Sequence, residues 1–238
     1  MNTNLVELVK KAAAEKAVEE NIKKNMILGV GSGSTVIYAV KKIAEMNRSH
    51  KLNLKCIPTS FQSSQLIIEH RLNLTSLNQY PLIDITIDGA DEIDKQMNLI
   101  KGGGGCLVQE KIVASNSKEL IIIADYRKKS EFLGENWKKG LPIEIIPSAH
   151  VPLMNKMKAL GGKPQLRMAQ AKAGPLITDN GNFILDVDFG IIKSPIELNS
   201  KICMIPGVVD TGLFIGMASK AFIGEKDGST SILEGKNL

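Results

Sequence analysis

The sequence of 238 residues is poor in aromatic side chains and contains no long apolar run. One Trp, three Tyr and six Phe are too few for the stacking surface that single-stranded nucleic acid requires. The longest apolar stretches, such as Leu120 to Ala124, are far too short to cross a bilayer. Residues 1–25 lack the apolar core of a secretory signal, so we expect a cytoplasmic protein.

Cysteine and histidine are also scarce, with three of each scattered singly along the chain. The cysteines form neither a disulfide framework nor a zinc motif, and the histidines lack the spacing of metal ligands. These residues are Cys56, Cys106, Cys203, His50, His70 and His150. Metal chemistry therefore has no evident site in this sequence.

What the chain does have is an ordinary globular composition with a mild positive charge. Hydrophobic residues make up 43% and charged residues 23%, which is typical of a soluble protein with a packed core. The net charge is +5, and Lys and Arg are spread along the chain rather than clustered. This balance fits a phosphorylated metabolite better than a nucleic acid.

The first 133 residues alternate short buried strands with amphipathic helices. Apolar spacing predicts helices at 4–24, 36–46, 61–70 and 107–115. Buried strands are expected at 26–30, 54–58, 83–87 and 120–125. This alternation predicts an α/β fold with a mostly parallel sheet and helices on its faces.

The pattern changes after about residue 133. A helix is expected at 151–160 and short strands at 142–147, 164–168, 176–178 and 183–187, with a tight hairpin turn at Asp179–Asn182. Near Pro206 the apolar, glycine-punctuated pattern returns, and we expect this segment to rejoin the first sheet. The sequence therefore predicts an α/β domain at 1–133 and 206–238, interrupted by an inserted α+β domain at 134–205.

A glycine-rich loop follows the first predicted strand. Ser32, Gly33, Ser34 and Thr35 lie between this strand and a helix, where backbone N–H groups and hydroxyls can bind an anion. A dinucleotide-binding fingerprint requires a third glycine where Ser34 stands and an acidic residue about 20 positions later, and both are missing. The loop also lacks the lysine of a P-loop. The alternative is a tight turn that binds nothing.

Four carboxylates follow the predicted strand at 83–87. Asp88, Asp91, Glu92 and Asp94 lie where ligands bind in open α/β sheets, at the carboxyl ends of the strands. Neighbouring carboxylates disfavour one another's charged forms, which suits proton transfer near neutrality. The alternative of helix capping or a solvated face is favoured for Glu92 and Asp94. A magnesium site has no support elsewhere in the sequence.

Four successive glycines after Lys101 are the rarest feature. Each glycine costs roughly 0.5–1 kcal/mol relative to alanine in a regular element, so this run predicts a loop that closes around a ligand. Lys101 could stabilise a developing oxyanion. Glu110, in the first turns of the following helix, is a candidate general base, and its alternative is an ordinary surface glutamate.

Three basic residues follow the predicted strand at 120–125. Lys128 could reach a phosphate from this edge of the sheet. Arg127 and Lys129 beside it leave the assignment open, and a lysine on a surface loop is usually just solvated.

Taken in order, these motifs resemble the A-type ribose-5-phosphate isomerase family. The similarity runs from about residue 5 to 225 without large gaps. It is carried by Gly29–Thr35, Asp88–Glu92, Lys101–Gly105 with Gln109–Lys111, Gly174–Asp186 and Ile205–Val209. One departure is Ser32, where many relatives carry threonine; the hydroxyl is retained.

The resemblance implies a Rossmann-like α/β domain with an inserted ferredoxin-like α+β domain, no cofactor or metal, and a homodimer or homotetramer. Glu110 would move the proton between C2 and C1 through an enediolate. Lys101 would stabilise the oxyanion, and Asp88 and Asp91 would bind hydroxyls and assist ring opening. The substrate contacts would be Ser32, Gly33, Ser34, Thr35, Asp88, Gly89, Ala90, Asp91, Lys101, Gly102, Gly103, Gly104 and Lys128.

Other functions compete with this interpretation. The nearest alternative is a related sugar-phosphate enzyme, such as an amino-sugar-phosphate isomerase or deaminase. A catalytically silent sugar-phosphate sensor is a second, although retention of Glu110 and Lys101 favours catalysis. A nucleotide-dependent oxidoreductase is the weakest because its fingerprint is incomplete.

Overall fold

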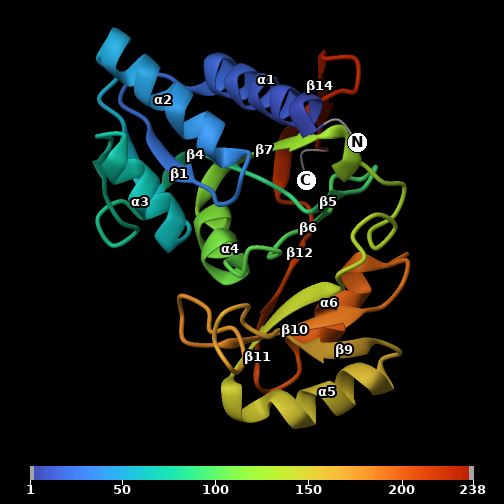
Figure 1. Ribbon diagram of the computed structural model, residues 1–238. Coiled ribbons are helices and arrows are strands. Elements are labelled where there is room, and N and C mark those ends of the chain that lie inside the picture. The colour runs from blue at the N-terminus through green and yellow to red at the C-terminus, as the bar shows by residue number, and fades with distance from the viewer. Residues whose placement is uncertain (1–2, 236–238) are drawn as a thin grey trace. The chain divides into compact units, whose positions relative to one another are not determined.

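The computed structural model describes residues 3–235, which form two compact units (Figure 1). Unit 1 consists of three stretches: the described residues through Ala90, Gln109–Arg127 and those from Gly216 onwards. Unit 2 consists of two stretches: Asp91–Val108 and Lys128–Ile215. The range predicted for an inserted domain, 134–205, lies wholly within unit 2, which also contains residues on both sides of that range.

Unit 1 is built on a seven-stranded sheet in the order β14-β13-β7-β4-β1-β2-β3. Every neighbouring pair is parallel except β13 and β14, which are antiparallel, so the predicted mostly parallel sheet is confirmed. The strands are β1 (Ile27–Val30), β2 (Lys55–Pro58), β3 (Asn73–Leu74), β4 (Ile83–Asp88), β7 (Ser117–Asp125), β13 (Ala218–Gly224) and β14 (Thr230–Glu234).

Helices cover both faces of this sheet. They are α1 (Thr3–Asn21), α2 (Val36–His50), α3 (Phe61–Glu69) and α4 (Leu107–Ser115), with a short 3-10 turn, η1 (Tyr126–Lys128), after β7. Successive residues of a strand point to opposite faces. Cys56 packs in the cluster that contains α1 and α2, whereas Ile57 packs with Val113 of α4. Figure 1 shows α1 and α2 side by side, as their packing against each other requires.

The strand order reverses between β1 and β4. From β1 the chain proceeds to β2 and β3 on one side, and then crosses to β4, β7 and β13 on the other. In open α/β sheets, ligands bind beside the carboxyl ends of the strands at such a reversal. The residues that follow β1 and β4 therefore occupy the expected binding position in unit 1.

Unit 2 contains a four-stranded antiparallel sheet with two helices. Its sheet order is β11-β8-β10-β9, and its chain order is strand, helix, strand, strand, helix, strand, which is the ferredoxin-like arrangement. The elements are β8 (Leu141–Ile145), η2 (Pro147–Ala149), α5 (His150–Ala159), β9 (Lys163–Leu166), β10 (Phe183–Asp188), α6 (Pro195–Cys203) and β11 (Val208–Thr211). The predicted ferredoxin-like fold is confirmed.

A small three-stranded sheet completes unit 2, in the order β12-β6-β5. Its strands are β5 (Glu92–Ile93), β6 (Leu99–Ile100) and β12 (Leu213–Phe214), and both pairs are antiparallel. Lys101 follows β6 directly, so this sheet sets where the glycine run begins.

Three local expectations differ from the structure. Residues 176–178 form no strand, because the Thr178 hydroxyl and the Asn180 and Asn182 amides all donate to Glu144 Oε1, which wraps this segment around a buried carboxylate. The helix α6 was not predicted. The return to the main sheet was predicted too early, since β11 pairs with β8 and only β13 rejoins the seven-stranded sheet. The turn predicted at Asp179–Asn182 is present, closed by the Thr178 N–H donating to the Asn182 carbonyl at 2.9 Å.

The three cysteines differ sharply in environment, which gives a test of the fold. Cys56 is fully buried in the main core, and burial raises the pKa of its thiol to about 12, whereas Cys203 is exposed. At about pH 8, near the ordinary thiol pKa, we expect a thiol reagent to modify Cys203 rapidly and Cys56 only after unfolding. Peptide mass mapping of the native and denatured protein measures this. Equal labelling of the two residues in the native protein would contradict the fold.

Candidate active site

The carboxylate of Asp88 is fixed at the point where the strand order reverses. Asp88 ends β4 and is fully buried. Its Oδ1 accepts the N–H of Ser32 at 3.0 Å and the N–H of Gly89 at 2.7 Å. A Cβ on Gly31 would lie 2.1 Å from the same oxygen, so only glycine fits at that position. The loop after β1 and the carboxylate after β4 are thus joined directly.

Hydroxyl groups tie this loop to the start of α3. The Ser32 and Thr59 hydroxyl oxygens lie 2.8 Å apart, and Ser32 Oγ also donates to Ser60 Oγ at 2.6 Å. Ser60 and Ser63 form a reciprocal capping box that begins the helix. The Gly33 N–H donates to the side chain of Gln62 at 2.8 Å. The helix predicted at 61–70 is confirmed, and it begins beside the glycine-rich loop.

A lysine that the sequence did not single out lies beside the loop. Lys10 Nζ on α1 is 3.2 Å from Ser34 Oγ and 2.8 Å from Glu7 Oε1, and its side chain is only 12% exposed. Glu7 also accepts the Tyr38 hydroxyl at 2.7 Å, and the bonds from Lys10 and Tyr38 lower the pKa of the Glu7 carboxyl. Neighbouring Lys11 is 54% exposed. Sequence spacing alone does not separate the two lysines, because each has a glutamate within one turn of the helix.

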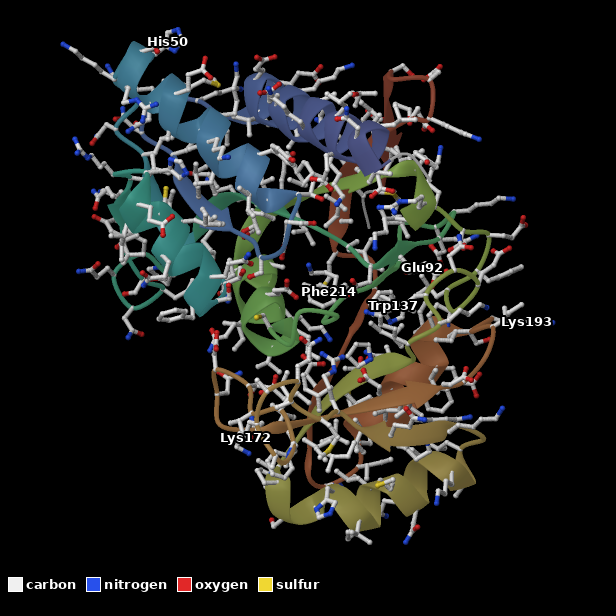
Figure 2. All side chains as sticks on the ribbon, in the orientation of Figure 1. His50, Glu92, Trp137, Lys172, Lys193 and Phe214 are labelled. Atoms are coloured by element: carbon white, nitrogen blue, oxygen red, sulfur yellow. The ribbon has the colours of Figure 1, made fainter. Side chains whose placement is uncertain are left out.

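In unit 2, Lys101 is held at the start of the glycine run. Its side chain is buried at 2% exposure, and its N–H donates to the Gly212 carbonyl at 2.8 Å. Its Nζ lies 5.4 Å from the ring centroid of Phe214, which is labelled in Figure 2. A buried ammonium over an aromatic face gains a cation–π attraction. The predicted cation is therefore placed by β6 and β12 together.

The glycine run itself lies close to Asp91 and Trp137. The N–H of Gly103 donates to Asp91 Oδ2 at 2.7 Å, and the Asp91 N–H donates to Ile100 O at 2.8 Å. A Cβ on Gly103 would lie 2.6 Å from Asp91 Oδ1 and 2.8 Å from the Trp137 ring. The residue must be glycine because the backbone passes so closely between these two side chains.

Glu110 lies in the first turn of α4 and is buried, with 5% exposure. The alternative of an ordinary surface glutamate is therefore wrong. The other candidates divide between the units. Ser32–Thr35, Asp88, Gly89, Ala90 and Glu110 belong to unit 1, and Asp91, Lys101–Gly104 and Lys128 belong to unit 2.

The structure distinguishes among the three basic residues after β7. Arg127 is engaged by Asp125, with its Nε 2.6 Å from Oδ1 and its Nη2 3.0 Å from Oδ2, and this hydrogen bonding raises the pKa of the guanidinium. Lys128 Nζ lies 5.7 Å from the centroid of the Trp137 ring. Because the Arg127 guanidinium already has a bidentate partner, Arg127 is a poor candidate for binding a phosphate.

Glu92 and Asp94 hold loop backbone. The expectation of helix capping or a solvated face is wrong for both, because both are buried and neither lies at the start of a helix. Glu92 is fully buried and accepts the N–H groups of Gly134 and Asn136, each at 2.6 Å. Asp94 accepts the N–H of Asn98 at 2.8 Å and so closes the turn between β5 and β6. Glu92 and Trp137, both labelled in Figure 2, lie in one region of unit 2, because Glu92 accepts the N–H of Asn136, the residue before Trp137.

Two negative findings apply to the part of the chain that the structure describes. Residues 3–235 contain no group of three or more His, Cys, Asp or Glu side chains arranged to hold a metal ion. Over the same residues, every helix is too short or too polar to cross a membrane.

The chain is similar to known proteins over most of its length. Residues 55–228 match the family model described as ribose 5-phosphate isomerase A (phosphoriboisomerase A). The ribose-5-phosphate isomerase of Sus scrofa is 55% identical over 229 residues, which cover 96% of this chain and 75% of the relative.

Solved structures show the same fold. Ribose 5-phosphate isomerase from Plasmodium falciparum is 39% identical with a TM-score of 0.91, and the match covers 97% of this chain and 100% of the other. A D-ribose-5-phosphate isomerase in complex with phospho-erythronic acid is 38% identical with a TM-score of 0.92, and covers 98% and 100%. Similarity of this extent in sequence and fold means that the chain belongs to the ribose 5-phosphate isomerase A family.

Proposed function

We propose that this chain interconverts D-ribose 5-phosphate and D-ribulose 5-phosphate, as an aldose–ketose isomerase of the non-oxidative pentose phosphate pathway. The chain belongs to this family, and two ionisable residues that flank its glycine run in the sequence are buried. This pair of buried residues is the observation that carries the proposal. Lys101 is 2% and Glu110 is 5% exposed. Burying such groups is costly, so their retention in these places favours a catalytic use.

Glu110 is the proposed general base. As a carboxylate it removes the proton from C2 of the open-chain aldose, and the electron pair of that C–H bond moves into the new C1–C2 double bond while the C1 oxygen gains negative charge. Return of the proton to C1 and transfer of the O2 hydroxyl proton to O1 then produce the ketose. No electron acceptor is consumed, so the reaction balances without a redox centre.

Lys101 is the proposed electrostatic partner of the enediolate. A fixed ammonium at the carbonyl oxygens stabilises the negative charge that develops as the proton leaves C2. This interaction is stronger in the transition state than in the bound substrate, and it therefore accelerates the reaction. Asp88 and Asp91 are proposed to bind the sugar hydroxyls and assist opening of the furanose ring. Gly89, Ala90 and the backbone of Gly102–Gly104 complete the proposed contacts with the sugar.

The phosphate is assigned to the loop after β1. Ser32, Gly33, Ser34 and Thr35 offer hydroxyls and N–H groups at the beginning of a helix, where negative charge is favoured. Lys10 supplies an ammonium 3.2 Å from Ser34 Oγ, and we add it to this proposal. Lys128 is the second proposed cation.

The ligand of one solved relative supports the same substrate class. That relative was obtained in complex with phospho-erythronic acid, which carries both a phosphate and a carboxylate. A carboxylate offers two oxygens of the kind that an enediolate presents at C1 and C2. We extend the proposal to a cytoplasmic homodimer or homotetramer that needs no cofactor, as the family resemblance implies.

The reaction is tested by a ribose 5-phosphate assay run with EDTA. We expect the reaction to reach equilibrium between ribose 5-phosphate and ribulose 5-phosphate in the presence of EDTA, because the proposed chemistry uses only side chains of this chain and no metal ion. The same preparation should leave glucosamine 6-phosphate unchanged. Turnover of the amino sugar alone would favour the isomerase/deaminase alternative, and binding without turnover would favour a sensor.

The role of Glu110 is tested by Glu110→Gln. The amide keeps the shape of the side chain but cannot accept the C2 proton, so turnover should fall by at least about 10²–10⁴-fold with the melting temperature preserved. Glu197→Gln, which removes an exposed carboxylate paired with Lys201, is the control and should keep normal turnover. Near-normal activity of Glu110→Gln would disprove the assignment.

The phosphate role of Lys10 is tested by comparing Lys10→Ala with Lys11→Ala. Loss of one charge-assisted contact should raise the KM of ribose 5-phosphate about tenfold in Lys10→Ala. The exposed Lys11 pairs with Glu15 on the same helix, so its variant should retain the parent KM. Equal KM values for the two variants in steady-state kinetics would remove Lys10 from the phosphate site.

A further inference from the structure

We propose that Arg167 is a positioning residue for the isomerisation, because it fixes the backbone of the glycine run that begins at Lys101. This inference rests on the proposed function. Arg167 follows β9, and none of the sequence motifs identified above marks it as functional. All of the contacts that carry the argument lie within unit 2.

The guanidinium of Arg167 divides its donors between two tasks. Its Nε donates to Asp186 Oδ2 at 2.8 Å, and its Nη2 donates to Asp186 Oδ1 at 2.5 Å. Its Nη1 donates to the carbonyls of Gly102 at 2.9 Å and Gly103 at 3.3 Å. The ion pair with Asp186 therefore aims the remaining nitrogen at two consecutive peptide groups of the glycine run.

One of these peptide groups is held from both ends. In the planar trans peptide between Gly102 and Gly103, the C=O and the N–H point in opposite directions. The C=O accepts from Arg167, and the N–H donates to Asp91 at 2.7 Å. A peptide group clamped between a cation and a carboxylate cannot rotate without losing a charge-assisted hydrogen bond.

The next peptide group is oriented by the same nitrogen. Because the Gly103 carbonyl is turned toward Arg167, planarity turns the N–H of Gly104 away from it. A Cβ on Gly104 would meet no atom within 4 Å, so there is open space beside this residue. Arg167 thus sets the direction of the backbone donor that the proposed function assigns to the sugar.

The glycine run needs such external support. Glycine has the largest backbone entropy to lose, and Gly102–Gly105 contribute no side chains that could pack. Arg167 itself is well anchored: its N–H donates to Ile184 O and its carbonyl accepts from Leu176, both at 2.9 Å. The anchored Arg167 side chain therefore restrains the backbone of the glycine run, which has no side chains to restrain it. Catalysis requires reacting groups to be held in a fixed geometry.

A purely structural role would predict different kinetics. If Arg167 only joins β9 to β10 through Asp186, its removal should lower stability and leave the turnover of folded enzyme unchanged. If it positions the loop, kcat should fall while the KM changes little, because the phosphate is bound by other residues. Lysine is no substitute, because one ammonium cannot match the guanidinium fork and also reach two carbonyls.

The test compares Arg167→Met with wild type and with Lys163→Met, an exposed control on β9 that also loses one positive charge. We expect kcat for ribose 5-phosphate to fall about 10²-fold in Arg167→Met, with the KM within about threefold of wild type. Hydrogen exchange of the peptide covering residues 101–106 should be faster in this variant only. If Arg167→Met does not fold, Arg167→Lys replaces it with the same expectations.

Chemical rescue adds a readout that a structural role would not give. Guanidinium at sub-denaturing concentration should restore part of the kcat of Arg167→Ala, whereas sodium chloride of equal ionic strength should not. A folded Arg167 variant with wild-type kcat and unchanged exchange in residues 101–106 would overturn the inference. Failure of the wild type to isomerise ribose 5-phosphate would instead overturn the proposed function, and the exchange measurement would still decide whether Arg167 orders the loop.

Discussion

The contact between the Asp88 carboxylate and the backbone after β1 is the constraint on which the larger unit depends. Two N–H groups, from Ser32 and Gly89, converge on one carboxylate oxygen, and Gly31 must lack a side chain for the approach to occur. This contact joins the carboxyl ends of two strands at the reversal of the sheet. A fully buried carboxylate is costly unless such hydrogen bonds compensate it, so the loop and the carboxylate stabilise each other.

In the smaller unit, contacts from neighbouring elements fix the conformation of the glycine run. Its glycine run has no side chains of its own, and so the neighbouring elements define it. Asp91 holds an N–H, Arg167 holds two carbonyls, and the Trp137 ring lies against Gly103. These three residues come from separate stretches of the chain. The loop can therefore approach a ligand closely and still keep one conformation, which a run of larger residues could not do.

Several charged groups are buried at some expense to stability. Lys101, Glu110 and Asp88 are each at most 5% exposed. The buried Glu92 and Glu144 accept two and three donors on their oxygens and serve to hold loops. Burial alone does not identify a catalytic residue, because Asp88 and Glu92 are both buried and each accepts two backbone N–H groups.

The sequence by itself determined the order and type of most helices and strands, the two glycine-rich loops and the family, because periodicity and glycine runs are local properties of the chain. It could not separate Lys10 from Lys11, reveal Arg167, or give the strand that β11 pairs with. These depend on contacts between distant segments: Lys10 meets Ser34 across 24 residues, and Arg167 meets Gly102 across 65. Such contacts exist only once the chain has packed, so only the tertiary structure decided them.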